Sequence, residues 1–322
     1  MTDLTVVVLR GAYPTSVAVT VDVLRAAAEL APRLGLVAPT WKVCSVDGGP
    51  LELQGGLTVA TTRLPARPRT CTSTWVLPGL GTVTADAVQA RLEEPDAVAV
   101  GTALARHARG GGQVAASCAA VFLLQPTGLL AGRRATTTWW LAPLLARWEP
   151  ACTVDADLMV CADGDLVTAG AAFAQTDLML HLLRTRYGAR LTDAVARSLL
   201  IDGRQAQAPY VVPEVLANGD ELVTRIVARI ESALPDPPSV AALAAELAMS
   251  ERTLARHVTR STGRSTHALV RSVRMRRARS LLAGTRMTVE QVAVAVGYSD
   301  ATALRRAMKQ SVGAGPSSYR AP

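Results

Sequence analysis

The spacing of apolar residues divides the 322-residue chain into parts of different character. Over residues 1–200, short continuous apolar runs alternate with longer helical stretches, which predicts a parallel sheet covered by helices. The expected strands are 4–9, 41–46 and 113–117, and the segment 74–81 is expected to be a strand that breaks into a Gly/Pro turn. An edge piece is expected at 57–62, and a hairpin turned by Asp163-Gly164 over 159–170. The expected helices are 14–31, 84–92, 96–109, 172–187 and 190–201. We therefore predict an α/β domain over residues 1–201.

A connector is expected over residues 202–238. It contains an amphipathic helix at 220–234, whose apolar stripe is Leu222, Ile226 and Ile230. The sequence PDPPS at 235–239 cannot continue that helix, because proline lacks the backbone N–H and clashes with the preceding turn. It is predicted to be a short, stiff linker with the domain boundary near residue 236.

Residues 239–322 carry short amphipathic helices in an arrangement that occurs twice. The aligned segments are SVAALAAELAMS (239–250) with TVEQVAVAVGYS (288–299), and LARHVTRSTG (254–263) with LRRAMKQSVG (304–313). Each copy has a capped helix, a tight turn, and a second helix capped by Ser250 or Ser299 with an acidic residue behind it. Gly297 supplies the positive φ that such a turn tends to need. The segment is predicted to be an all-α tandem helix-turn-helix domain.

The second helix of each copy has a basic outer face. In the first copy, arginines recur every fourth residue, and Leu254 and Val258 point the other way. The expected DNA-contacting residues of the two copies are Arg252, Arg256, Arg260, Thr302, Arg305, Arg306 and Lys309. The planar guanidinium group matches the O6 and N7 acceptors of guanine in the major groove. A lone basic face is usually only solvated, but two at matching positions predict binding to double-stranded DNA.

The segment between the copies, HALVRSVRMRRARSLLAG (267–284), is predicted to be one long helix. Its apolar stripe is Val273, Ala278, Leu281 and Leu282, and the arginines at 271, 274, 276, 277 and 279 cover the rest. Such a helix would span roughly 26 Å, and successive major grooves are about 34 Å apart. One chain is therefore expected to read two adjacent grooves from one side of the duplex.

Charge is concentrated at the same end of the chain. Residues 236–322 carry a net charge of +9, whereas the rest of the chain carries −1. This asymmetry favours nucleic acid as the partner of the C-terminal domain. The five cysteines (44, 71, 118, 152 and 161) have no metal-ligand spacing, and no secretory leader or membrane-length apolar run is visible. We expect a cytoplasmic protein without a metal, a cofactor or a membrane partner.

The candidate chemistry of the N-terminal domain lies in VAASCAAVFLL, 114–124. A strand is expected to end at Ser117, the chain to turn at Cys118, and an apolar helix to begin there. At a helix N-terminus the dipole and the free N–H groups favour a thiolate, and small neighbours such as Ala120 allow a tight nucleophile elbow. A cysteine among alanines is also a common inert packing residue, so the residues alone leave both interpretations open.

Residues 239–320 resemble the AraC family DNA-binding domain, whose signature tail matches GYSDATALRRAMKQSVGAGPSSYR at 297–320. Leu304 and Met308 stand where that family usually has Phe, which concerns core packing. The resemblance places Arg252 and Arg256 at base-reading sites in the first copy. Arg305 and Arg306 fall in the equivalent region of the second.

Residues 4–200 resemble the ThiJ/PfpI branch of the class I glutamine amidotransferase-like superfamily. The matching segments are SCAAVFLL…GLLAGRRATTTWW (117–140) and DGDLVTAGAAFAQTDLMLHLL (163–183). This implies a flavodoxin-like parallel sheet. Together the two resemblances identify the chain with the amidotransferase-like AraC regulators and imply a transcription regulator that activates, contacts RNA polymerase, and forms a homodimer through the N-terminal domain.

The resemblance also bears on catalysis. Cys118 stands at the elbow and Asp22 where an acidic residue often approaches it, but the expected histidine is Thr138. The other histidines of this domain, His107 and His181, lie in helical stretches and are expected to be surface or packing residues. Because a cysteine without a positioned base does not readily transfer acyl groups, the elbow is predicted to be vestigial. The alternatives are a thiol hydrolase or deglycase-like enzyme, and a redox sensor using an exposed, low-pKa Cys118.

A pocket formed by Asp22, Gly79, Cys118 and Trp139 is the candidate site for a small-molecule effector. Its alternative is that the N-terminal domain serves only as a dimerisation platform.

Overall fold

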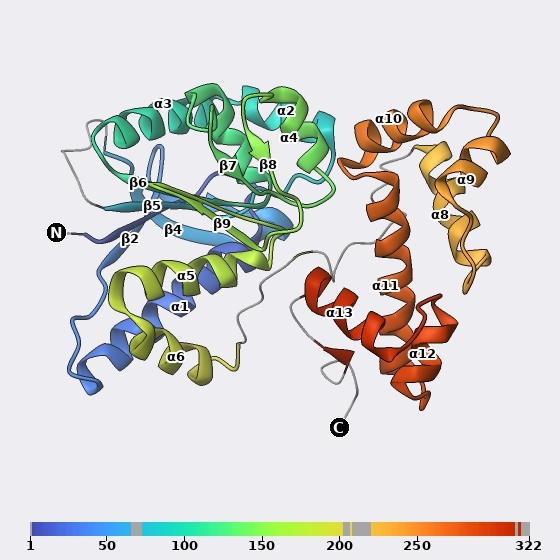
Figure 1. The fold of residues 1–322 in the computed structure, drawn as a ribbon. Helices are drawn as coiled ribbons and strands as arrows, with labels where there is room; N and C mark the ends of the chain where they lie inside the picture. Colours follow the sequence, from blue (N-terminus) through green and yellow to red (C-terminus); the bar gives the residue numbers. More distant parts are fainter. Residues whose placement is uncertain (1, 66–72, 202–206, 208–219, 313–314, 317–322) are drawn as a thin grey trace. The chain divides into compact units, whose positions relative to one another are not determined.

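The computed structural model describes residues 2–65, 73–201, 207, 220–312 and 315–316. Contacts divide the chain into two compact units, Met1–Arg204 and Gln205–Pro322 (Figure 1). Buried apolar residues form clusters within each unit, so each unit has its own hydrophobic core. None of the described helices is long and apolar enough to cross a membrane.

In the first unit, eight of the described strands form a sheet in the order β3-β4-β2-β1-β5-β6-β10-β9, and β7 pairs with β8 separately. Their bounds are β1 Leu4–Val7, β2 Trp41–Ser45, β3 Gly49–Glu52, β4 Thr58–Arg63, β5 Thr74–Leu77, β6 Gln113–Ser117, β9 Val160–Asp163 and β10 Leu166–Ala169. The inner neighbours pair in parallel, and the β3–β4 and β9–β10 pairs are antiparallel. The inner strands β1, β5 and β10 are buried along their whole length, as continuous apolar runs in a parallel sheet require.

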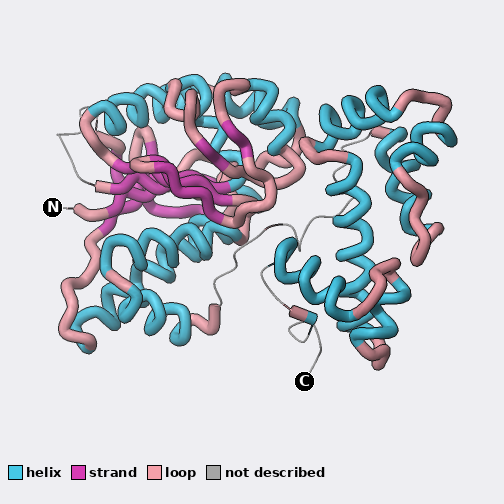
Figure 2. The backbone as a smooth tube through the Cα atoms, in the orientation of Figure 1, coloured by secondary structure: helices cyan, strands magenta, loops and turns pink. Residues whose placement is uncertain are grey.

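Helices cover both faces of this sheet (Figure 2). One face carries α1 (Pro14–Arg33), α5 (Ala174–Tyr187) and α6 (Ala189–Ser198). The other carries α2 (Ala85–Glu93), α3 (Pro95–Arg109), the 3-10 helix η2 (Cys118–Thr127), α4 (Ala142–Trp148) and the short strands β7 (Arg134–Ala135) and β8 (Thr153–Val154). A separate apolar cluster fills each interface. The flavodoxin-like fold is therefore confirmed.

The strand expected to break into a turn within 74–81 is confirmed, because β5 ends at Leu77. Two details of this domain differ from the sequence prediction. The strand expected at 4–9 ends at Val7, where the chain leaves the ladder at the carboxyl end of the strand. The segment expected as an edge piece at 57–62 is β4, which lies inside the sheet. The edge is β3, because the turn through Gly55 and Gly56, both with positive φ, folds β3 back along β4.

The second unit is helical in its described residues. Its helices are α8 (Glu221–Ser232), α9 (Val240–Glu246), α10 (Glu251–Thr262), α11 (Thr266–Gly284), α12 (Val289–Ala295) and α13 (Ala301–Val312). The α9–α10 and α12–α13 pairs are the two copies of the repeat, with α11 between them. Thr288 and Gln291 form a reciprocal capping box at the start of α12, and Gly297 has a φ of 78°. The tandem helix-turn-helix prediction is confirmed.

Helix α8 packs against α11, and its contacts place it in the second unit. Its buried stripe is Val223, Ile226, Val227 and Ile230. Leu222, the expected first residue of the stripe, is only partly buried, and its neighbour Val223 is buried instead. The buried face of α8 supplies apolar area that α11 covers, which is why a segment expected as a connector becomes part of a compact unit.

Candidate nucleic-acid interface and the cysteine elbow

The first basic face lies on α10. Arg252, Arg256 and Arg260 are exposed, while Leu254 and Val258 on the opposite side are completely buried. Ser250 caps this helix by accepting a hydrogen bond from the Thr253 N–H. The spacing of four residues therefore leaves three guanidinium groups available to a ligand, as the sequence predicts.

The second basic face lies on α13. Its outward residues, Thr302, Arg305, Arg306 and Lys309, are exposed, and the inward residues Leu304 and Met308 are buried in the unit's core. Arg305 also forms a 3.4 Å ion pair with Glu290 of α12, and both side chains are more than half exposed. An ion pair this exposed is weak and leaves Arg305 available to a polyanion.

The cap of α13 differs from the expected one. The helix begins at Ala301, and the Asp300 carboxylate accepts a 2.7 Å hydrogen bond from the Ala303 N–H, while Ser299 donates to Asp300. The backbone hydrogen bond from Ala303 is the main cause that lowers the pKa of Asp300. The prediction of Ser299 as the cap was wrong because the two copies of the repeat slip by one residue at this point.

Two arginines of α11 make contacts within the second unit. Arg274 donates from Nε to the Val296 carbonyl oxygen at 2.7 Å, and its guanidinium lies 4.3 Å from the centre of the Tyr298 ring. Arg276 pairs with Glu231 of α8. The expectation that the α11 arginines simply cover the outside of the helix was wrong at these two positions, and Arg271 and Arg277 remain exposed.

In the first unit, the chain makes a sharp elbow between β6 and η2. Cys118 has a φ of 55°, which is unusual for a residue with a side chain. Its N–H donates to the Gly170 carbonyl at 2.7 Å, and the Thr137 hydroxyl donates to its carbonyl oxygen at 2.8 Å. A Cβ atom on Gly79 would lie 2.8 Å from the Cβ of Cys118, so only glycine fits against the elbow. The backbone geometry of a nucleophile elbow is present.

The thiol of Cys118 is fully buried. Cys118 has no exposed surface, and burial raises the pKa of its thiol to about 12. The expectation of a favoured thiolate, and with it an exposed redox thiol, was wrong because burial among apolar side chains disfavours the charged form. Of the other cysteines, 44, 152 and 161 are also free and buried, and Cys71 lies outside the described residues.

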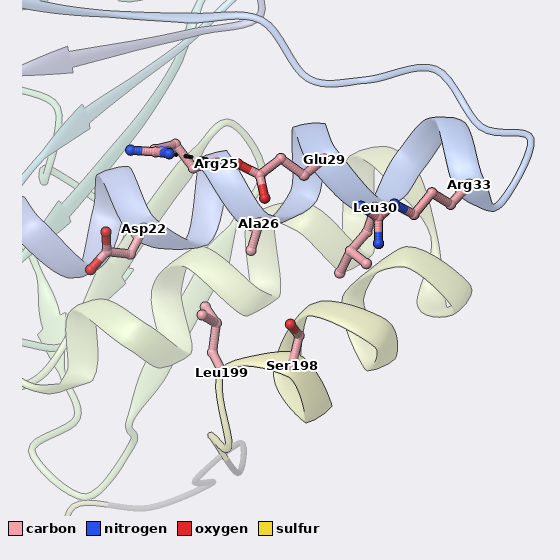
Figure 3. Close-up of a pocket in the computed structure, with 8 residues that line it drawn as sticks. All are labelled: Asp22, Arg25, Ala26, Glu29, Leu30, Arg33, Ser198 and Leu199. Carbon is pink, nitrogen blue, oxygen red and sulfur yellow. Dashed lines mark ion pairs between the residues drawn. The ribbon is translucent and has the colours of Figure 1, made fainter.

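Asp22 lies apart from the elbow. It is exposed on α1 and lines an open pocket of about 280 Å³ between α1 and α6, together with Arg25, Ala26, Glu29, Leu30, Arg33, Ser198 and Leu199 (Figure 3). The α1 residue near Cys118 is Ser16, which is buried and close to Gly79. Ser16 is six residues before Asp22, about 9 Å along the helix. The expected approach of Asp22 to Cys118 was therefore wrong.

Most of the remaining predicted residues are buried, and His181 is half-buried. Trp139 is 5% exposed and packs edge-to-face against Trp140. Thr138, at the position expected for histidine, is fully buried, and its hydroxyl has no hydrogen-bond partner among the described residues. His107 is buried against Trp75, and burial lowers its pKa and that of His181. In the part of the chain that is described, no group of three His, Cys, Asp or Glu residues is placed to hold a metal ion.

Comparisons with known families match the two units separately. The model of the DJ-1/PfpI family matches residues 42–185, and a helix-turn-helix domain model matches residues 243–322. The chain is 28% identical over 235 residues to the HTH-type transcriptional regulator ArgR of Pseudomonas aeruginosa, covering 70% of this chain and 69% of the relative. It is 26% identical over 303 residues to the HTH-type transcriptional regulator GlxA of Rhizobium meliloti, covering 92% and 89%.

Solved structures resemble the first unit in fold. Drosophila melanogaster DJ-1beta matches with a TM-score of 0.50 and 24% identity, covering 63% of this chain and all of that one. An AraC family transcriptional regulator from Pseudomonas putida matches with a TM-score of 0.51 and 21% identity, covering 62% and 100%.

Proposed function

This chain belongs to the transcription regulators that join a DJ-1/PfpI domain to an AraC-type helix-turn-helix domain, and we propose that it binds specific duplex DNA sites through α10 and α13. The family assignment confirms the resemblance expected from the sequence. The observation that carries the DNA-contact proposal is the repeated basic face, exposed on both helices over a buried apolar side. Each face presents arginines that fit the acceptors of guanine in the major groove.

Helix α11 suits the reading of two adjacent grooves. Its 19 residues correspond to a length of about 28 Å, which is close to one turn of the DNA helix. Recognition by one chain would then cover two successive major grooves from one side. The +9 charge of residues 236–322 adds attraction to the phosphate backbone, which is independent of sequence.

For the first unit we propose a homodimeric regulatory role without acyl-transfer activity. The elbow keeps its backbone geometry, but the thiol is sealed and the histidine position holds a buried threonine. A threonine hydroxyl cannot act as the base that a cysteine nucleophile needs, and the buried thiol is not accessible to a substrate. Dimerisation would link two DNA-binding units and raise their affinity for paired sites. In this proposal the dimer activates transcription by contacting RNA polymerase at chromosomal sites in the cytoplasm, and a small effector acts on the first unit.

The proposal is tested by selecting genomic DNA fragments on the purified full-length protein, sequencing them, and repeating the binding over a salt series. The expected result is a short recurrent motif, with an affinity that falls steeply with salt. Arg256→Ala should weaken binding to that motif, and Arg190→Ala, which removes an exposed charge of α6 in the first unit, is the matched control. Salt-sensitive binding without a recurrent motif would contradict specific recognition.

A further inference from the structure

Asp220 joins the start of α8 to the DNA-facing helix α10. As the cap of α8, its Oδ1 atom accepts a 3.2 Å hydrogen bond from the Val223 N–H. Its Oδ2 atom accepts a hydrogen bond from the Ser261 hydroxyl at 2.5 Å and lies 2.7 Å from Nε2 of His257. One carboxylate therefore ties two helices together.

Partial burial makes this carboxylate more than a surface group. The side chain of Asp220 is 21% exposed and that of His257 is 25% exposed. Burial alone would raise the pKa of Asp220, but the hydrogen bonds from Ser261, Val223 and His257 outweigh it and hold the pKa below its usual value. Asp220 is consequently an ionised acceptor at neutral pH, and such acceptors form the stronger hydrogen bonds.

The other ring nitrogen of His257 fixes the direction of the hydrogen bonds. Nη2 of Arg260 lies 3.3 Å from Nδ1 of His257. A guanidinium group can only donate, so Nδ1 accepts and carries no proton. The proton of the neutral ring is then on Nε2, which donates to Asp220. The hydrogen bonds run in one direction, from Arg260 through His257 to Asp220.

Arg260 stands at the end of α10 where backbone contacts are expected. In helix-turn-helix proteins, residues near the N-terminus of the recognition helix contact base edges. Arg252 and Arg256 occupy that part of α10, whereas Arg260 lies in the last turn. A long side chain held in place before binding loses less conformational freedom when the DNA arrives. Holding Arg260 would therefore favour a phosphate contact.

We propose that Asp220, His257 and Arg260 form a positioning relay that presents Arg260 to a DNA phosphate from the start of α8. The relay rests on the proposed function, since it adds a residue that touches no base to the DNA-binding machinery. It also makes the DNA contact dependent on the cap of α8, which lies within the segment 202–238 that the sequence marks as the connector between the domains. A displacement of that helix start would release Arg260.

A double-mutant cycle in the full-length protein tests the relay, with affinity for the selected DNA motif measured at constant salt. His257→Ala is expected to weaken binding about three- to tenfold in the parent chain and to have no effect in the Arg260→Ala background. His257→Gln, whose amide can both accept and donate, should restore most of the loss. Arg190→Ala, which removes an exposed charge of α6 in the first unit, should leave affinity unchanged.

Equal losses for His257→Ala in both backgrounds would overturn the relay, because they would indicate a general distortion of α10. Unchanged affinity in Arg260→Ala would also overturn it, and the proposed function would stand as long as Arg256→Ala weakens binding. Thermal unfolding of each variant separates loss of fold from loss of contact. If neither Arg256→Ala nor Arg260→Ala changes binding, the proposed function itself fails.

Discussion

The cysteine elbow and the reading helices are two regions that the sequence marks equally clearly, and the structure treats them in opposite ways. At the elbow, the strained backbone of Cys118 is kept while its thiol is fully buried. On α10 and α13, the basic side chains remain exposed over a buried apolar face. The elbow therefore keeps the backbone geometry of its motif but not an accessible thiol, whereas α10 and α13 keep accessible basic side chains. Exposure of the side chain to a ligand separates the two regions.

Residues with positive φ occur in both regions, and their surroundings differ. Cys118, Ala248 and Gly297 all have positive φ. Ala248 and Gly297 occupy matching positions in the two helix-turn-helix copies; Ala248 is exposed, whereas Gly297 lies against Pro235. A Cβ atom there would be 2.0 Å from the Pro235 carbonyl oxygen. The second copy thus needs glycine for space as well as for conformation.

Gly297→Ala is expected to have the largest effect. The added Cβ meets backbone at Pro235, and the left-handed conformation adds strain, so the second unit should lose roughly 3 kcal/mol of stability. Denaturant unfolding and specific DNA affinity should both show the loss. A stable, fully active variant would mean that the linker does not contact this turn.

Arg256→Ala should come next, with a loss of about 1–3 kcal/mol in binding to the specific site and a relaxed base preference at one position. Arg306→Ala, its counterpart on α13, should relax a different position about one helical turn away. Sequencing of DNA selected by each variant measures this. If both variants relax the same position, one chain does not read two adjacent grooves.

Cys118→Ser should lower stability by about 1 kcal/mol, because a hydroxyl group replaces a thiol in an apolar site, and should leave DNA affinity unchanged. The native thiol should also resist a thiol reagent at pH 8 until the protein unfolds. Because the pKa is raised from 9.0 to about 12, the buried thiol adds stability that is complete below pH 9 and is lost as pH rises toward 12. Rapid labelling of the native protein, or a collapse of DNA binding, would contradict the sealed elbow.

Local signals made most of the fold predictable. The repeat, the capped helix starts and the apolar strands depend on neighbouring residues, and they appear where the sequence places them. What failed depends on distant contacts. Asp22 was expected at the elbow, but Ser16 lies there and bonds Ala172, 156 residues away. His257 was missed altogether, since its partner Asp220 is 37 residues away in the sequence.

Ala248→Gly sharpens the comparison with the smallest expected effect. Glycine relieves left-handed strain of about 1–2 kcal/mol and adds about 0.5–1 kcal/mol of conformational entropy to the unfolded chain, so the net gain in stability should be about 0.5 kcal/mol. Ala248 is exposed, so its side chain contributes little packing that the change could remove. Denaturant unfolding of Ala248→Gly and Gly297→Ala under the same conditions compares the change in the free energy of unfolding at the two turns. A large loss in Ala248→Gly would show that the alanine makes a contact of its own, and the two copies would then differ in packing at both turns rather than at one.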